Sequence, residues 1–366
     1  MNMGWRKNRW AYAAVGGFVV VAAALGYWLS PRTPTPPAPT MSPVELSIVQ
    51  SVGADFNGPL EELLRPFVEQ HPEVRLSVRY DAHAWEGSDG ATRGPHLALR
   101  VSNGSATPGG VPLFASDYVV LAYNRELVPE APKTWRDIIA HGYTLKEKGT
   151  VPYGIVLAEE MHSLLPFFGD LFQAGGPGDT TREAFALLSD LRFKYGLTPG
   201  ACLSECVVQV FKEGRAPFAV IGEWRLPELR SALGGKLGLT AIPALPGSGA
   251  RVRSAQRVYA LFRAGEAPKR ELEAADALLR FVEKESASRL MATLGKAALQ
   301  PVAASASAEE LALAAASVDA VEVPEARVRA AEAALAPIWE QFATGRLSAE
   351  GAARSLVAAV STPVQN

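Results

Sequence analysis

Residues 44–80 read VELSIVQSVGADFNGPLEELLRPFVEQHPEVRLSVRY, and this stretch contains both periods of regular secondary structure. Apolar and polar residues alternate over 44–48 and over 74–80, which is the period of a β-strand. Between them, apolar residues recur at the spacing of one helix face, at Leu60, Leu63, Leu64, Phe67 and Val68. A strand, a helix and a strand in succession make a βαβ unit, so the sequence predicts a parallel sheet.

The rest of the chain continues this alternation, with an Ala-rich helical end. Gly-, Ser- and Pro-rich stretches at 81–95 and 102–112 predict loops. The spacing predicts further strands over 96–101, 118–123, 152–157, 217–222, 237–242 and 255–262. It predicts helices over 160–174, 180–195, 203–213, 225–233, 268–295, 307–315, 326–344 and 348–361, and a short one after Thr134. The predicted fold class is therefore α/β throughout.

Length and charge limit the organisation and the partners. The chain has 366 residues, and the part after residue 43 is longer than one hydrophobic core usually organises, so we expect two lobes. The formal net charge is -2, with both signs spread along the chain. A chain without a basic patch has little attraction for a phosphate backbone, so no nucleic-acid partner is expected.

The N-terminus predicts a membrane anchor. Residues 10–29 carry no charge and are almost all apolar, and about 20 helical residues span a bilayer core. Basic residues precede this run, so the positive-inside rule makes residues 1–9 a cytoplasmic stub and places the rest outside. A cleaved signal peptide is the competing interpretation, although Tyr27 and Trp28 form a poor cleavage neighbourhood. We therefore expect a single-pass protein of the cell inner membrane, with its globular part in the periplasm or extracellular space.

Residues 30–43 read SPRTPTPPAPTMSP and include six prolines. Proline favours the extended polyproline II conformation, at about 3.1 Å per residue, so this segment would reach roughly 40 Å. We expect it to act as a linker that holds the globular part away from the membrane.

The two cysteines, Cys202 and Cys206, are too few for a disulfide scaffold. A zinc site would need two further ligands nearby, and no second cluster of cysteines or histidines follows, so no metal site is expected. Outside the cytosol the pair would form one small local disulfide or remain as two free thiols, and the sequence leaves both open.

Motifs for enzymatic chemistry are absent from the sequence. It contains no glycine-rich phosphate loop, no dinucleotide fingerprint, no H-E-x-x-H and no G-x-S-x-G. The adjacent acids Glu159 and Glu160 are more typical of a helix start, where they complement the helix dipole, than of a catalytic pair. We therefore predict that the chain is not an enzyme and needs no cofactor.

Three stretches resemble the extracellular solute-binding proteins of the maltose-binding type, family 1 of the binding proteins of ABC importers. They are VVLAYNRELVPEAPKTWRDI at 119–138, FKEGRAPFAVIGEW at 211–224 and ATGRLSAEGAARSL at 343–356. Weaker similarities follow at 254–262, SAQRVYALF, and 295–302, GKAALQPV. The stretches keep the family's order within residues 44–361.

This resemblance implies two α/β lobes of a periplasmic-binding-protein-like fold, joined by crossing strands, with solute bound in the cleft between them. The first lobe would comprise residues 44–117 plus about 250–300, and the second 118–249 plus about 301–361. It also implies that a small solute, by default a sugar, is delivered to the permease subunits of an ABC importer.

The resemblance also implies ligand-binding residues. Trp224 matches the family's sugar-stacking tryptophan, and an indole face packs well on the apolar face of a pyranose. Glu160, Met161 and His162 fall where the family has a Glu-Pro-aromatic loop in the cleft. Asp117 lies at the hinge strand, where the family often carries an acid for hydroxyl groups. Gln256 and Arg257 are weaker candidates on the third crossing strand.

The sequence also departs from the family pattern. Gly53 and Ala54 stand where maltose binders carry an acid and a lysine, although Phe56 and Asn57 remain candidate ligand contacts. The segment between the second strand and Asp117 is shorter than in the family. We therefore expect a trimmed first lobe and a solute other than maltose itself. The alternative function is a degenerate binding-protein domain that acts as an interaction or sensory module.

Overall fold

A computed structural model describes the chain from residue 42 onward, with interruptions. The described residues are 42–81, 95–101, 110–172, 179–252, 255–264, 267–284, 294, 296–299, 306–318, 321–322 and 325–361. The chain divides into two units, Met1–Pro43 and Val44–Asn366, and the description below concerns the second.

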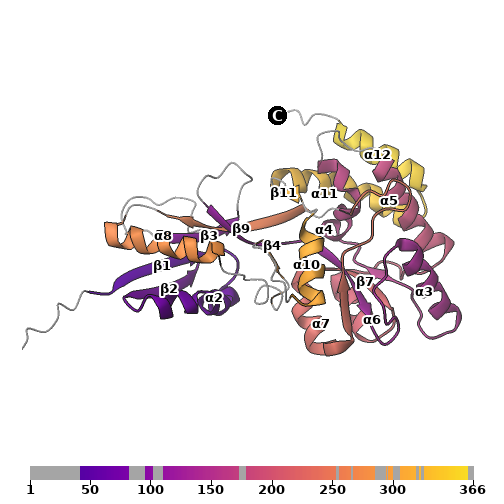
Figure 1. Cartoon of the computed structure of the whole chain (residues 1–366). Coiled ribbons are helices and arrows are strands. Elements are labelled where there is room, and N and C mark those ends of the chain that lie inside the picture. The colour runs from indigo at the N-terminus through magenta and orange to yellow at the C-terminus, as the bar shows by residue number, and fades with distance from the viewer. Residues whose placement is uncertain are drawn as a thin grey trace, which may run out of the picture. The chain divides into compact units, whose positions relative to one another are not determined.

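The described residues form two β-sheets (Figure 1). The first sheet has the strand order β10-β4-β9-β3-β1-β2, with β11 paired to β9. Its strands are β1 Val44–Gln50, β2 Val74–Tyr80, β3 Leu97–Val101, β4 Gly110–Ser116, β9 Ala255–Arg263, β10 Ala297–Ala298 and β11 Val321–Glu322. β1 pairs in parallel with both β2 and β3, which confirms the βαβ prediction. β9 lies between β3 and β4 and is antiparallel to both.

Helices α2 (Asn57–Gln70) and α8 (Lys269–Lys284) pack together on the first sheet. α2 follows the short 3-10 helix η1, Ala54–Phe56. The rings of Phe67 on α2 and Phe281 on α8 lie 5.6 Å apart. The apolar residues that defined the predicted helix, Leu60 and Leu64, are fully buried against the strands. We call this sheet with its two helices the first lobe.

The second sheet has the order β6-β7-β5-β8. Its strands are β6 Val156–Leu157, β7 Phe218–Gly222, β5 Val119–Asn124 and β8 Leu237–Thr240. All of β5 is buried, and its residues alternate between two separate cores: Leu121 belongs to one, and Val120 to the other. Side chains of a strand point alternately to the two faces, so a strand with no polar face must be covered on both sides.

Helices cover both faces of the second sheet, and together they make the second lobe (Figure 1). One face carries α3 Trp135–Glu147, α4 Met161–Leu164, the 3-10 segment η2 Leu165–Phe172, α5 Asp179–Ser189 with the π-helical turn η3 Asp190–Lys194, α11 Glu325–Ala343 and α12 Ala349–Ser361. The other carries α6 Ser204–Lys212, α7 Leu226–Leu233 and α10 Ala308–Val318. The short 3-10 helices η4, Glu223–Arg225, and η5, Gly234–Lys236, flank α7.

Only Asp117 and Tyr118 separate β4 of the first sheet from β5 of the second. Asp117 has a φ of 65°, in the left-handed region that L-residues rarely adopt, though Asp tolerates it better than most. The chain turns at this residue as it passes from one sheet to the other.

Several sequence predictions need correction. Residues 110–112, predicted as loop, begin β4; Pro112 interrupts the regular pairing there, because it has no N–H to donate, and a register shift follows it. The predicted strand 152–157 shortens to β6, since Gly154 donates to the carbonyl of Leu197 rather than to a strand. The predicted helix 160–174 is one α-turn followed by a kinked 3-10 segment.

The predicted anchor, residues 10–29, and most of the linker lie outside the described residues. Among the residues that the structure describes, none of the helices combines the length and the apolar character needed to cross a bilayer.

Candidate functional site

The predicted ligand residues of the second lobe follow or precede strands at one edge of its sheet. Asp117 comes just before β5, and Trp224 comes just after β7. β5 and β7 are antiparallel, with Val119 opposite Gly222, so the start of one lies beside the end of the other. β6 runs parallel to β7, and His162 follows its end after a short loop. The topology therefore brings these side chains to a common edge.

Trp224 is half-buried, and its indole lies directly over Gly222. A Cβ added at Gly222 would lie 2.1 Å from Cη2 of the indole, so only glycine permits this position. The imidazole of His162 lies beside it, with 5.2 Å between the ring centroids. Two aromatic rings from separate loops thus meet at the edge of the sheet.

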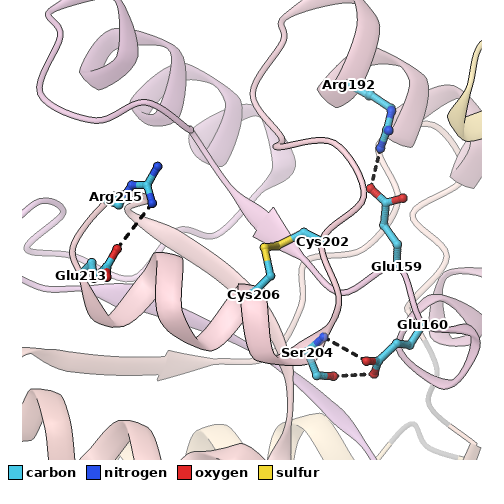
Figure 2. The surroundings of a disulfide bond; sticks show 8 residues. All are labelled: Glu159, Glu160, Arg192, Cys202, Ser204, Cys206, Glu213 and Arg215. Carbon is cyan, nitrogen blue, oxygen red and sulfur yellow. Dashed lines mark hydrogen bonds and ion pairs between the residues drawn. A yellow bond between two sulfur atoms is a disulfide. The ribbon is translucent and has the colours of Figure 1, made fainter.

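Glu160 is the acid of this group, and Ser204 holds both of its carboxylate oxygens (Figure 2). The backbone N–H of Ser204 donates to Oε1 at 3.0 Å, and its hydroxyl donates to Oε2 at 2.5 Å. Nε2 of His162 is 3.1 Å from Oε2. Partial burial would raise the pKa of Glu160, but the hydrogen bonds from Ser204, with the charges of His162 and Arg225, outweigh it and lower the pKa. The carboxylate is therefore ionised at neutral pH.

The neighbouring acid, Glu159, has a structural environment. Its Oε1 lies 2.5 Å from Nη1 of Arg192, and its Oε2 accepts a hydrogen bond from the indole of Trp339 at 3.4 Å. Its backbone N–H donates to the carbonyl of Cys202. Glu160 lies at a helix start, as expected, since it is the N-cap residue of α4. Its side chain makes no capping bond there and accepts from the N–H of the first residue of α6 instead.

Cys202 and Cys206 form a disulfide, which resolves the alternative that the sequence left open. Cys202 precedes α6 and Cys206 lies in its first turn, so their Cα atoms are only 5.3 Å apart. This separation is well within the range that a disulfide can bridge. Ser204 lies between the two bonded cysteines (Figure 2).

Asp117 makes contact with a residue of the first sheet. Its Oδ2 lies 3.0 Å from Nε of Arg257 on β9, and both side chains are about half exposed. Its backbone N–H donates to Oε1 of Glu223 at 2.8 Å. The weaker sequence candidate, Gln256, lies on β9 opposite Glu322 of β11.

Glu223 is a buried carboxylate that the sequence analysis did not single out. Its Oε1 also accepts hydrogen bonds from the hydroxyl of Ser116 at 2.7 Å and from Nζ of Lys296 at 2.8 Å. Its Oε2 is buried and has no hydrogen-bond partner among the residues that the structure describes. Burial raises the pKa of Glu223, against the opposing effects of Lys296, Ser116 and Asp117. We call these four residues the crossing network, because they join the second sheet to the chain segments that leave it.

The remaining candidate ligand residues either lie away from this edge of the sheet or already have contacts within the fold. Phe56 belongs to the buried core of the first lobe, where its ring lies 5.2 Å from that of Phe114. Asn57 is half-buried, and its side-chain oxygen accepts a hydrogen bond from Gln50. Met161 packs against the core of the second lobe.

A separate pocket of about 410 Å³ opens beside β8. None of the predicted ligand residues lines it. Its walls are mainly Ala, Pro and Ile side chains, with Lys133 and Arg251 as the basic members. The pocket therefore does not coincide with the edge at Trp224, and we base the site on the contacts between the candidate residues.

A mixed α/β fold of two lobes, with aromatic and acidic side chains gathered at a sheet edge, is the arrangement expected of a solute-binding protein. Residues 101–320 match the family described as "Bacterial extracellular solute-binding protein", and the chain belongs to this family. Membership confirms the resemblance inferred from the sequence and the prediction that the chain is not an enzyme. It also makes the folded part an extracytoplasmic domain.

Solved structures share the fold at low sequence identity. A solute-binding protein from Staphylococcus aureus in complex with maltose is 15% identical, with a TM-score of 0.65, and the match covers 88% of this chain and 97% of that one. A cyclic alpha-maltosyl-1,6-maltose binding protein from Arthrobacter globiformis is 18% identical, with a TM-score of 0.62 and coverage of 87% and 98%. The MalE domain from Bdellovibrio bacteriovorus bound to maltotriose is 18% identical, with a TM-score of 0.57 and coverage of 88% and 100%. No curated protein matches the chain.

Proposed function

We propose that this chain is a membrane-tethered binding protein that captures a carbohydrate outside the cytoplasm for an ABC importer. The observation that carries the proposal is the contact between Trp224, His162 and Glu160 at one edge of the second sheet. A pyranose presents an apolar face that packs on an aromatic ring and hydroxyl groups that donate to a carboxylate. These three side chains offer both kinds of contact.

The proposed ligand residues are Trp224, His162 and Glu160, with Asp117 at the start of β5 and Met161 beside them. Gln256, predicted from the sequence, lies on β9, but its side chain is outside the described part of the structure. Phe56 is left out because it is buried among other rings. The structural relatives support carbohydrate as the ligand class, since their names record maltose, maltotriose and a cyclic maltosyl-maltose.

Membrane tethering and delivery to a permease rest on the N-terminal sequence and on the family resemblance. In this proposal residues 10–29 remain as a single-pass anchor in the inner membrane, and residues 30–43 hold the binding domain outside. Protease protection of the N-terminal stub in inside-out and right-side-out vesicles tests the orientation. Release of the folded part as a soluble protein, with residues 1–29 removed, would contradict the tether.

The binding proposal is tested by calorimetry on the full chain in detergent, with maltose, maltotriose and maltotetraose as probes. We expect heat of binding and a raised Tm with at least one of them. Trp224→Ala should weaken that binding by roughly tenfold or more, since removal of a stacked aromatic ring costs about 1–2 kcal/mol. The matched control is Tyr143→Ala, which removes an exposed aromatic ring on α3 and should leave binding unchanged. Absence of heat and of any Tm shift across the panel would contradict binding of this class of carbohydrate, the maltodextrins.

A second candidate function is an interaction or sensory module derived from a binding protein. The burial of Phe56 and the engagement of Asn57 by Gln50 favour it, because these first-lobe candidates are occupied within the fold. In this case permease subunits would co-purify equally with the wild type and with Trp224→Ala, while no probe in the panel would bind.

A further inference from the structure

The Cys202–Cys206 disulfide lies close to the proposed ligand residue Glu160, and Ser204 connects the two. It closes a five-residue loop at the start of α6, from Cys202 to Cys206. A covalent link across so short a loop removes most of the conformations that the intervening residues would otherwise sample. The backbone conformation of Ser204, at the centre of this loop, is thereby restricted, and so is its position relative to β6.

Ser204 contacts Glu160 through two donors from the same residue. The N–H reaches one carboxylate oxygen and the hydroxyl reaches the other, so the plane of the carboxylate is fixed as well as its position. The carbonyl of Cys202 accepts from the N–H of Glu159 at 2.8 Å, which ties the same loop to the backbone just before Glu160. Figure 2 shows the disulfide, Ser204 and the two hydrogen bonds from Ser204 to Glu160.

Glu160 remains accessible while it is held. Its side chain is 28% exposed, and the imidazole of His162 next to it is 46% exposed. Each carboxylate oxygen has more than one acceptor position. Oε2 already faces the hydroxyl of Ser204 and Nε2 of His162, so acceptor capacity for a hydroxyl group of a ligand remains at Oε1. When the accepting carboxylate is already held in one orientation, ligand binding costs less conformational entropy than when the carboxylate is mobile.

We propose that the disulfide and Ser204 together form a positioning device for Glu160, which holds this carboxylate in the orientation that receives the hydroxyl groups of a sugar. This inference rests on the proposed function of the site. In this proposal neither cysteine touches the ligand, and both act on Glu160 through Ser204. Opening the disulfide should release Ser204 and let the Glu160 carboxylate rotate.

The test begins with a readout that needs no ligand. The full chain in detergent is labelled with ¹³C at the side-chain carboxyl of glutamate, and the signal of Glu160 is assigned by its loss in Glu160→Gln. We expect the pKa of Glu160 to be below its ordinary value in the oxidised wild type. It should rise after reduction with a phosphine, in C202A/C206A and in Ser204→Ala, because each removes or loosens donors to the ionised form.

The matched control is Ser248→Ala. Ser248 also donates through its N–H and its hydroxyl to a glutamate, Glu183, but far from the disulfide in sequence. This variant should leave the pKa of Glu160 unchanged. Circular dichroism and Tm show whether each variant is folded, and reduction of the folded wild type supplies the comparison if C202A/C206A does not fold. An unchanged pKa of Glu160 on reduction would overturn the proposal.

The second readout is the affinity for the probe that binds the wild type most tightly among maltose, maltotriose and maltotetraose. We expect Kd to rise about tenfold in C202A/C206A and in Ser204→Ala, the usual effect of losing one hydrogen bond to a charged group. An unchanged Kd, with a shifted pKa, would overturn the role of the device in ligand binding. If the pKa shifts but the wild type binds no probe, the carbohydrate proposal fails while the positioning of Glu160 by the disulfide stands.

Discussion

At the end of β7, two adjacent residues have opposite environments. Glu223 is fully buried in the crossing network, whereas Trp224 is half exposed beside His162. The glycine before them makes both possible, because the indole occupies the space where a side chain at position 222 would lie. Two adjacent residues of one 3-10 turn therefore supply a structural contact and a proposed ligand contact.

Gly222→Ala tests the position of the indole. The added methyl group would overlap three ring carbons of Trp224, so the indole must move. We expect a loss of about 1–3 kcal/mol in the free energy of unfolding and a larger effect on the affinity for a carbohydrate probe. Tryptophan fluorescence and calorimetry measure the two effects. Gly58→Ala, at a position with open space, is the control, and equal behaviour of the two variants would contradict the argument.

The buried pair Glu223–Lys296 predicts a pH-dependent stability. Burial raises the pKa of Glu223, so the folded state favours the protonated acid; its contribution to stability is present at acidic pH and is lost as pH rises through the folded pKa. Lys296→Met removes the positive charge that offsets this burial. We expect it to cost about 3 kcal/mol at pH 8 and less at pH 5, where the acid takes up a proton.

Urea unfolding of the wild type and Lys296→Met at the two pH values measures this difference. The double variant E223Q/K296M should recover most of the loss, because glutamine keeps an acceptor for Ser116 and for the N–H of Asp117 without a buried charge. A cost of Lys296→Met that does not change between pH 5 and pH 8 would contradict the prediction.

The sequence predicted some of these residues and missed others for a physical reason. Trp224 belongs to a stretch that resembles the family and His162 falls at a position where the family has an aromatic residue, so the resemblance singled out both. Ser204 contacts Glu160 from 44 positions away, and Lys296 contacts Glu223 from 73 positions away. Such pairs come together only in the folded chain, and no periodicity in the sequence signals them.

Among the elements, α3 is fixed by a feature at each end. Its first turn has a capping box, in which Thr134 and Asp137 exchange side-chain to backbone hydrogen bonds. Near its other end, Gly142 lies against Gly154, so that two backbones approach closely. A Cβ at Gly142 would lie 2.9 Å from Cα of Gly154. Close contact of backbones is the reason for glycine at both positions.

Gly142→Ala should destabilise the second lobe even though alanine is the better helix former. The gain in helix propensity is about 1 kcal/mol, whereas the contact with the backbone of Gly154 cannot be relieved by a side-chain rotation. We expect a net loss of about 1–2 kcal/mol in urea unfolding. The same substitution at Gly58, in α2, should be neutral or stabilising, and a stabilising Gly142→Ala would contradict the close contact.

Elements with a clear period were predicted well, and elements with a broken period were not. The continuous apolar run of β5 and the helical spacing of α2 gave both elements nearly their observed bounds. β4 begins within a Gly- and Pro-rich stretch and contains Pro112, so its start has the composition of a loop. Partners on both sides, β9 and β10, stabilise it as a strand, and neither is adjacent in sequence.

At the scale of the whole molecule, the first lobe is built from two distant parts of the chain. β1 to β4 end at Ser116, and β9 begins at Ala255, yet β9 lies between β3 and β4 in the sheet. The second sheet is made from the residues between them. Chain length and periodicity indicate two lobes, but they do not show that the first lobe is built from residues on both sides of the second sheet. That arrangement was expected only from the resemblance of separated motifs to the family.

A chain that ends after residue 254 tests this dependence. It retains β1 to β8 but lacks the strand that joins β3 to β4, so the first sheet would be split. We expect amide hydrogens of β1 and β3 to exchange rapidly in this fragment and slowly in a chain that ends at Ser361. Equal protection of β1 and β3 in the two chains would contradict the prediction.

The central place of β9 also affects the time at which the polypeptide can fold. During synthesis the N-terminal strands emerge long before their middle partner, and the second lobe in turn waits for α11 and α12 to cover one face of its sheet. The first lobe therefore cannot become compact before β9 has been made, and the second lobe cannot become compact before α12 has been made. Contacts so distant in sequence also form slowly. For an extracytoplasmic domain, this arrangement of strands delays compaction of the newly made chain until its late segments are available.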